Sequence, residues 1–233
     1  VEEILSALEH RGLPPSVIEE RLAGIMKTTY LEDLKDRSPH NLSGGQKQRV
    51  ALAATLALGN DILILDEPTS ELDEHATKRI ADILRDLKDQ GKTILLVEHK
   101  YSHFRDMIDT LIVMENGRIA AMGVPQAVLN DDHVRGMVLP DFSSVRKAAG
   151  PVPGDPIISI KNLTHCYGDV QALSGISLSI RKGEFIAIVG ENGSGKTTLV
   201  KHFNKLLSPT SGDVIVNGRN TKECSIATLA RDV

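Results

Sequence analysis

Residues 190–197 read Gly-Glu-Asn-Gly-Ser-Gly-Lys-Thr and fit the phosphate-binding pattern G-x-x-x-x-G-K-[ST] at every fixed position. The apolar run Phe185–Val189 predicts a strand before this loop, and Gly195–Leu207 is predicted to form a helix after it. Glycines let backbone N–H groups converge on phosphate oxygens, Lys196 can reach the β- and γ-phosphates, and the Thr197 hydroxyl can ligate Mg²⁺. An ordinary glycine-rich turn would need neither strand nor helix, so the context favours a site for phosphate groups and Mg²⁺.

A second segment with chemical potential is the short apolar run Ile62–Leu65, which is followed by Asp66 and Glu67. A continuous apolar run of this length is typical of a strand buried on both faces of a parallel sheet. In nucleotide hydrolases such a strand presents an aspartate to Mg²⁺, here Asp66, and Glu67 is placed to polarise the attacking water as a general base. A buried strand that ends in an acidic turn before Pro68 is the alternative explanation.

A third segment, Leu42–Gln46, reads Leu-Ser-Gly-Gly-Gln at the start of a predicted helix, Ser43–Leu58. Ser43 is expected to cap this helix, and the two glycines that follow leave its N-terminus free of side chains. Because a helix N-terminus carries partial positive charge, such a stretch can bind an anion. A helix cap without any ligand is the alternative.

The remaining pattern predicts helices first and buried strands afterwards. Helices are expected over Val1–His10, Ser16–Thr28, Ser43–Leu58, Glu74–Gln90, Gly195–Leu207 and Ser225–Arg231, and strands over Ile62–Leu65, Thr93–Val97, Thr110–Met114, Arg118–Ala121, Ile157–Leu163, Ala172–Ile180, Phe185–Val189 and Asp213–Val216. Alternating buried strands and helices indicate an α/β protein with a three-layer core. The apolar side of the helix Glu74–Gln90 suits packing on a sheet better than it suits a partner-binding stripe.

Four motifs resemble, in order and spacing, those of the ATP-binding-cassette (ABC) family: Leu42–Gln46, Asp66-Glu67, Ser70–Asp73 and Val97–His99. The resemblance extends over nearly the whole chain. It implies the P-loop NTPase fold of an ABC ATPase, with a helical subdomain and an antiparallel β-subdomain, and it implies hydrolysis of ATP with Mg²⁺.

The resemblance also implies roles for individual residues. The signature residues, which contact the γ-phosphate of a nucleotide held by another domain's phosphate loop, are Ser43, Gly44, Gly45 and Gln46. The nucleotide-binding residues of the phosphate loop are Gly190, Asn192, Gly193, Ser194, Gly195, Lys196, Thr197 and Thr198.

Four further positions match family motifs. Ser70 and Asp73 correspond to the loop that crosses the interface between two domains, and His99 corresponds to the histidine that contacts the γ-phosphate. Tyr167 corresponds to the aromatic residue that stacks on adenine. Apart from its motif, an isolated histidine at a strand end or a tyrosine in a strand would be interpreted as structural. The remaining histidines show no ligand pattern and are interpreted as structural or solvated.

The order of the motifs is unusual. In the family, one domain runs from phosphate loop to signature, acidic strand and histidine, whereas here the phosphate loop comes last. We therefore expect the back part of a first nucleotide-binding domain at 1–139, a proline- and glycine-rich linker at 140–156, and the front part of a second domain at 157–233. We interpret the sequence as a window of a longer protein in which the two domains pair within one chain.

This order predicts a phosphate loop that lacks the acids of its own domain, so we expect the chain to hydrolyse ATP poorly or not at all. The two parts nevertheless supply most of one domain in circularly permuted order, and each would leave apolar strands bare on its own. We hypothesise that the phosphate loop lies against Asp66, Glu67 and His99, which requires Lys196 to be close to Asp66. In the full-length protein we expect the pairing implied by the family resemblance instead, in which the phosphate loop of one domain faces the signature of the other.

Composition restricts the function further. The chain has 233 residues and a formal net charge of -4, so no basic field indicates binding to nucleic acid. Its longest strongly apolar stretch, Val50–Leu58, is far below the ~20 residues of a membrane-spanning helix. Cys166 and Cys224 show no metal-ligand spacing.

The wording of Asp66–Asp73 and of Glu98–Lys100 resembles the tandem ATPases of energy-coupling-factor importers, which take up vitamins or transition-metal ions such as cobalt and nickel. This resemblance implies a peripheral ATPase subunit on the cytoplasmic face of the membrane, bound to a transmembrane transporter subunit. The alternative is a soluble tandem ABC ATPase acting on ribosomes or in nucleic-acid repair, whose linker is usually long, charged and helical. A regulatory domain that binds nucleotide without turnover is a third possibility. The presence of Glu67 and Lys196, both residues of the catalytic motifs, argues against it for the longer protein.

Overall fold

The computed structural model describes residues 2–9, 13–35, 37, 42–70, 72–98, 102–131, 134–135, 154–190 and 193–229. His99, Asn192 and most of the predicted linker at 140–156 lie outside the described residues. The chain separates into two compact units. We call residues 1–60 with 71–87 the helical unit, and residues 61–70 with 88–233 the β unit. The division into 1–139, 140–156 and 157–233 stays a prediction.

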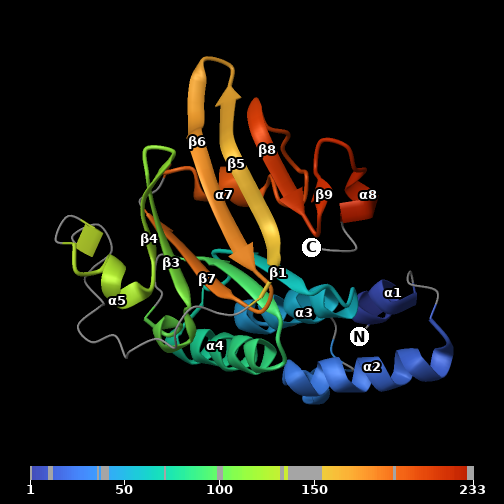
Figure 1. Cartoon of the computed structure of the whole chain (residues 1–233). Coiled ribbons are helices and arrows are strands. Elements are labelled where there is room, and N and C mark those ends of the chain that lie inside the picture. Colours follow the sequence, from blue (N-terminus) through green and yellow to red (C-terminus); the bar gives the residue numbers. More distant parts are fainter. Residues whose placement is uncertain are drawn as a thin grey trace. The chain divides into compact units, whose positions relative to one another are not determined.

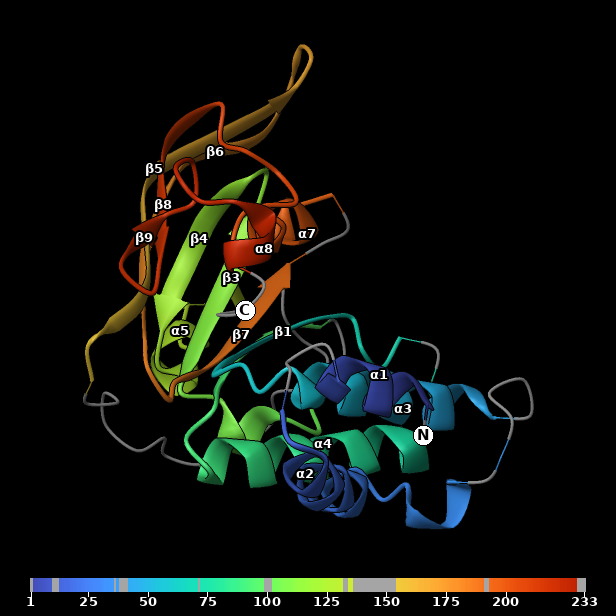
Figure 2. The ribbon, with the colours of Figure 1, turned by 90° about the vertical axis from the view of Figure 1, so that its right-hand side faces the viewer.

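The helical unit consists of α1 (Glu2–Glu9), α2 (Pro15–Thr28), the short 3₁₀ helix η1 (Glu32–Leu34), α3 (Gly44–Ala57) and all but the end of α4 (Glu74–Asp89). The first three α-helices pack against one another, as Figures 1 and 2 show. Their small core contains Ile4, Leu8, Met26, Leu31, Ala53 and Ala57. The predicted helices of this region are confirmed, and the apolar side of α4 is buried.

The β unit contains a five-stranded sheet in the order β1-β2-β7-β3-β4. These strands are β1 (Ile62–Asp66), β2 (Thr93–Val97), β3 (Thr110–Glu115), β4 (Arg118–Gly123) and β7 (Phe185–Gly190), with the short helices η3 (Arg105–Met107) and α5 (Pro125–Val128) nearby in the chain. All neighbours in the sheet are parallel except β3 and β4. Strand β7 therefore lies between two strands that precede it by about seventy residues or more in the sequence, as the hypothesis of a permuted domain requires.

A second, antiparallel sheet has the order β6-β5-β8-β9. It is built from β5 (Pro156–Tyr167), β6 (Val170–Arg181), β8 (Ser211–Val216) and β9 (Arg219–Asn220), and the long β5–β6 hairpin is prominent in Figure 1. Alternating side chains of β6 are buried and exposed, as expected when one face of a sheet covers a core. This sheet corresponds to the predicted antiparallel β-subdomain.

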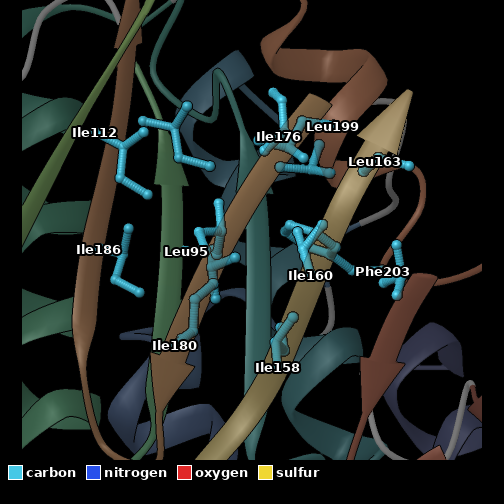
Figure 3. Close-up of a cluster of buried hydrophobic side chains, with 14 of the residues drawn as sticks. Leu95, Ile112, Ile158, Ile160, Leu163, Ile176, Ile180, Ile186, Leu199 and Phe203 are labelled. Atoms are coloured by element: carbon cyan, nitrogen blue, oxygen red, sulfur yellow. The ribbon is translucent and has the colours of Figure 1, made fainter. Parts of the chain in front are cut away.

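The core of the β unit lies between its two sheets. Figure 3 shows Leu95, Ile112 and Ile186 of the parallel strands in one cluster of buried side chains with residues of the hairpin, such as Ile158 and Ile180. Leu199 of α7 (Lys196–Val200) belongs to the same cluster, so the helix that follows the phosphate loop is fixed by this core.

One helix is much shorter than predicted. The expected helix Gly195–Leu207 ends at Val200, and the chain continues in turns to Lys205, whose φ is +59°. The Thr198 carbonyl, which would accept the His202 N–H in a continuing helix, accepts a hydrogen bond from the His202 imidazole instead, while that N–H bonds to Leu199. The helix α8 (Ile226–Leu229) is short as well. Among the described residues, no helix is long and apolar enough to cross a membrane.

Packing between the two sheets is expected to dominate the stability of the β unit. Leu95→Ala removes a side chain that is 0% exposed, and we expect it to lower the free energy of unfolding by about 2–5 kcal/mol in urea titrations. Leu206→Ala, at a side chain that is 61% exposed, is the matched control and should change it by less than about 0.5 kcal/mol. Equal losses in the two variants would contradict the assignment of the core.

Candidate functional site

Two glycines of the phosphate loop occupy positions that no other residue fits. A Cβ on Gly190, where φ is +148°, would lie 2.1 Å from the Met114 carbonyl oxygen. A Cβ on Gly195, where φ is +97°, would lie 2.8 Å from the Ala172 carbonyl oxygen. The loop is thus pressed against the β3–β4 turn, whose Gly117 N–H donates to the Ser194 carbonyl at 3.0 Å. Neighbouring strands fix the position of the loop.

The open side of the loop suits a phosphate group. Among the described residues, no atom would lie within 4 Å of a Cβ on Gly193, so no described side chain fills this side. The Ser194 Oγ is buried and has no hydrogen-bond partner among the described residues. Buried hydroxyls normally have a partner, and a phosphate oxygen would supply one here. The residues present therefore fit a nucleotide triphosphate.

Lys196 begins α7 and is 5% exposed. Its ammonium donates to the Gly190 carbonyl at 3.0 Å, so the side chain folds back along the loop. Burial lowers the pKa of Lys196, and the carboxylates of Glu67 and Asp66 oppose this shift because they stabilise the charged form. Helix α7 contacts β1, so the structure places Lys196 near both acids, as the hypothesis drawn from the sequence requires. His99, the third residue of that hypothesis, lies outside the described residues.

The two acids stand at the carboxyl end of β1. Asp66 pairs with Val97 in register, and the Glu67 N–H donates to the Val97 carbonyl at 2.9 Å. Glu67 has φ +50°, a left-handed conformation that is uncommon for a residue with a Cβ and that recurs at functional sites. Since β1, β2 and β7 are parallel, the acids and the phosphate loop lie at the same edge of the sheet.

Glu98 is a site residue to which the sequence analysis gave no role of its own. It follows β2, is 2% exposed, and its Oε1 accepts a hydrogen bond from the Thr69 backbone N–H at 2.9 Å and another from the Thr69 hydroxyl. These bonds fix the segment after Glu67 to the end of β2, directly before His99. An acid directly after the predicted buried strand Thr93–Val97 was the available signal.

Tyr167 ends β5 at the tip of the hairpin, where its ring is 50% exposed. Its partner in register is Val170, which is also exposed. The Tyr167 and His165 rings form a T-shaped pair, with the two ring centroids 4.7 Å apart. An exposed aromatic ring that is held by a buried neighbour can stack on a nucleotide base.

The signature residues lie in the helical unit, at the start of α3. Ser43 caps the helix as predicted: its Oγ accepts the Gln46 N–H at 3.3 Å, and its own N–H donates to the Gln46 Oε1 at 2.9 Å. A Cβ on Gly45 would lie 2.8 Å from the Cβ of Ala76, so this glycine also allows α3 and α4 to approach closely.

A pocket of about 350 Å³ opens beside this helix start. It is lined by Tyr30, Asp33, Leu34, Ser43, Gly45, Gln46, Arg49, Asp73, His75, Ala76 and Arg79. Burial lowers the pKa of Arg49, and the positive charge of Arg79 lowers it further. The Arg49 guanidinium donates to the Thr29 and Tyr30 carbonyls, and the carboxylates of Asp33 and Asp73 also line the pocket, so the pocket carries charges of both signs beside the helix N-terminus.

The two predicted interface residues fall in different units. Asp73 belongs to the helical unit, where its Oδ1 accepts the Ala76 N–H at 2.7 Å and so caps α4. Ser70 belongs to the β unit, where its N–H donates to the Glu67 carbonyl at 3.3 Å.

Thr197 is exposed in the first turn of α7, and Thr198 is partly buried beside it. The roles of these residues stay predictions.

A phosphate loop between a parallel strand and a helix, with two carboxylates at the same sheet edge, defines a P-loop nucleotide-binding protein. The model of the family described as ABC transporter matches residues 2–70 and 173–233, which is more than half of the chain. The chain therefore belongs to the ABC transporter ATP-binding family, whose members in general bind ATP with Mg²⁺ and hydrolyse it.

Two curated relatives agree with this assignment. A protein of Methanosarcina mazei, provisionally named ABC transporter ATP-binding protein, is 47% identical over 99% of this chain and 46% of its own length. A protein of the same name from Methanosarcina acetivorans is 44% identical over 99% of this chain and 44% of its own length. The chain thus spans about half the length of these curated relatives. The solved structure of cbiO1 from Clostridium perfringens, described as part of the ABC transporter complex cbiONQ, is 37% identical over 52% of this chain and 49% of that chain, with a TM-score of 0.48.

The buried His202 predicts a pH dependence of stability. Burial lowers the pKa of His202 below its ordinary value of 6.5, so the unfolded chain binds the proton more tightly than the folded chain. The contribution of neutral His202 to the free energy of unfolding is therefore complete above pH 6.5 and is lost as the pH falls below that value. We expect the free energy of unfolding, measured in urea between pH 7.5 and 5.5, to fall less steeply in His202→Gln. Parallel curves for the two proteins would count against a buried, neutral His202.

Proposed function

We propose that this chain is part of the ATP-hydrolysing subunit of a membrane transporter, of the kind found in energy-coupling-factor importers. The observation that carries the ATP-binding part is the juxtaposition of Lys196 with Asp66 and Glu67 at one edge of a parallel sheet. A cation for the phosphates, an acid for the metal ion and an acid for the water are the groups that phosphoryl transfer needs.

In this proposal the triphosphate lies along the loop from Gly190 to Thr198. The backbone N–H groups and Ser194 Oγ donate to phosphate oxygens, and Lys196 exchanges its bond to the Gly190 carbonyl for the β- and γ-phosphates. Thr197 and Asp66 supply the oxygen ligands that Mg²⁺ prefers, and bound Mg²⁺ would neutralise phosphate charge. The adenine stacks on the exposed face of Tyr167.

Glu67 is the proposed general base. Its backbone has a left-handed conformation and donates a hydrogen bond to the Val97 carbonyl. The chain therefore turns at Glu67, directly after β1 ends. The bonds between Glu98 and Thr69 hold this turn against β2, so a water bound at Glu67 has a defined position. The signature residues would complete the site of a nucleotide held by another domain. We expect only slow turnover by this chain, because its phosphate loop lacks the acids of its own domain.

The transport role rests on membership of the family and on the wording of Asp66–Asp73 and Glu98–Lys100. A transmembrane subunit would be the partner, and the cytoplasmic face of the membrane would be the location. Two nucleotide-binding domains would pair within the full-length protein. ATP binding would close this pair and hydrolysis would reopen it.

The ATP site can be tested by binding of MgATP to the purified chain. We expect Lys196→Ala to weaken binding about tenfold or more, because a hydrogen bond to a charged group contributes about 1.5–3 kcal/mol. Asp66→Asn should weaken binding with Mg²⁺ present and have little effect in EDTA, since its carboxylate acts through the metal ion. Lys201→Ala, which removes an exposed lysine just after α7, is the charge-matched control and should bind normally.

The pattern of losses separates two arrangements. If both substitutions weaken binding, the phosphate loop and the acids of β1 form one site. If only Lys196→Ala matters, the loop binds nucleotide without those acids. Binding that neither substitution affects would overturn the proposed ATP site.

A further inference from the structure

A continuous series of contacts joins Tyr167 to the phosphate loop through two buried histidines. The Tyr167 and His165 rings meet edge to face at 4.7 Å, and the His165 and His202 rings meet in the same way at 4.8 Å. The His202 Nε2 lies 3.2 Å from the His165 Nδ1, and the His202 Nδ1 lies 2.7 Å from the Thr198 carbonyl oxygen. Thr198 is in the first turn of α7, two residues after Lys196.

The polar atoms of this series determine which nitrogens carry protons. The His202 Nδ1 must donate, because its partner is a carbonyl oxygen. A neutral His202 then presents an unprotonated Nε2, which can accept from the His165 Nδ1–H. That N–H also lies 3.1 Å from the Ser208 carbonyl oxygen, so His165 is held by two acceptors. Hydrocarbon side chains of similar size could fill this space but could not make these bonds.

The series spans the two halves of the proposed nucleotide site. Tyr167 lies at the end of β5 in the antiparallel sheet, whereas Thr198 follows β7 of the parallel sheet. His202 also ends α7, since its ring takes the Thr198 carbonyl from the helix. The imidazole is 0% exposed, so its position is fixed by the surrounding core.

We propose that His165 and His202 are positioning residues that fix the base-stacking face of Tyr167 relative to the phosphate loop, so that the base and the triphosphate of one nucleotide reinforce each other's binding. The proposal rests on the proposed function, because it assumes that Tyr167 meets the base and the loop meets the phosphates. A base platform whose orientation is set before binding needs no ordering when the nucleotide arrives. A ligand without a base cannot benefit from this arrangement.

The test compares two ligands, ATP and inorganic tripolyphosphate, by calorimetric titration of the whole chain with Mg²⁺. We expect His165→Leu to weaken ATP binding about 3- to 10-fold, which corresponds to the loss of one aromatic pair interaction. Tripolyphosphate binding should stay within about 2-fold of wild type. In a Tyr167→Ala background, His165→Leu should cause no further loss, because the two residues then act as one unit.

Further variants keep the test decisive. Gln171→Leu changes an exposed residue that pairs with Cys166 on the same hairpin, and it should bind both ligands as wild type does. His202→Gln, which keeps a donor near the Thr198 carbonyl, should lose ATP affinity selectively but less than His165→Leu. Equal losses for ATP and tripolyphosphate, or additive losses with Tyr167→Ala, would overturn the positioning role. A wild-type chain that binds neither ligand would overturn the proposed function and this inference with it.

Discussion

The pairing of β7 on both of its edges is the constraint on which the β unit depends. Every residue from Phe185 to Val189 is buried, so this strand is stable only inside a sheet that is covered on both faces. Its neighbours are β2 and β3. In this order only β2 separates β7, which leads into the phosphate loop, from β1, which ends at Asp66. The geometry of the site therefore follows from burial of an apolar strand, not from attraction between Lys196 and the acids.

Tight backbone packing then decides the shape of the loop. Gly190 and Gly195 have neighbouring carbonyl oxygens where a Cβ would stand, whereas Gly193 faces open space. One side of the loop is thus filled by β3, β6 and the turn at Gly117, and the other is left for a ligand. The same glycine pattern that identifies the motif in the sequence is required by packing on one side and by phosphate on the other.

The sequence predicted what local chemistry determines and, from its bare apolar strands, the approach of the phosphate loop to the β1 acids, but it missed individual tertiary contacts. The loop, the β1 acids and the Ser43 cap depend on residues close together in the chain, and the structure contains all three. The helix after the loop was predicted to run to Leu207, but a ring from His202 takes one of its carbonyls and ends it. The His165–His202 contact joins residues 37 apart, and no periodicity signals such a pair. The position of Glu98 directly after a buried strand was visible in the sequence, but its bond to Thr69 was not.

The signature segment differs from the phosphate loop in how its donors are used. In the capping box, the Ser43 Oγ already accepts the Gln46 N–H and the Gln46 side chain already accepts the Ser43 N–H. Under the proposed role, a γ-phosphate from another domain would therefore meet the first N–H groups of α3, which have no partner within the helix, and the Ser43 hydroxyl proton. The cap keeps these donors oriented before the phosphate arrives, so contact with a second domain needs no rearrangement of the helix start.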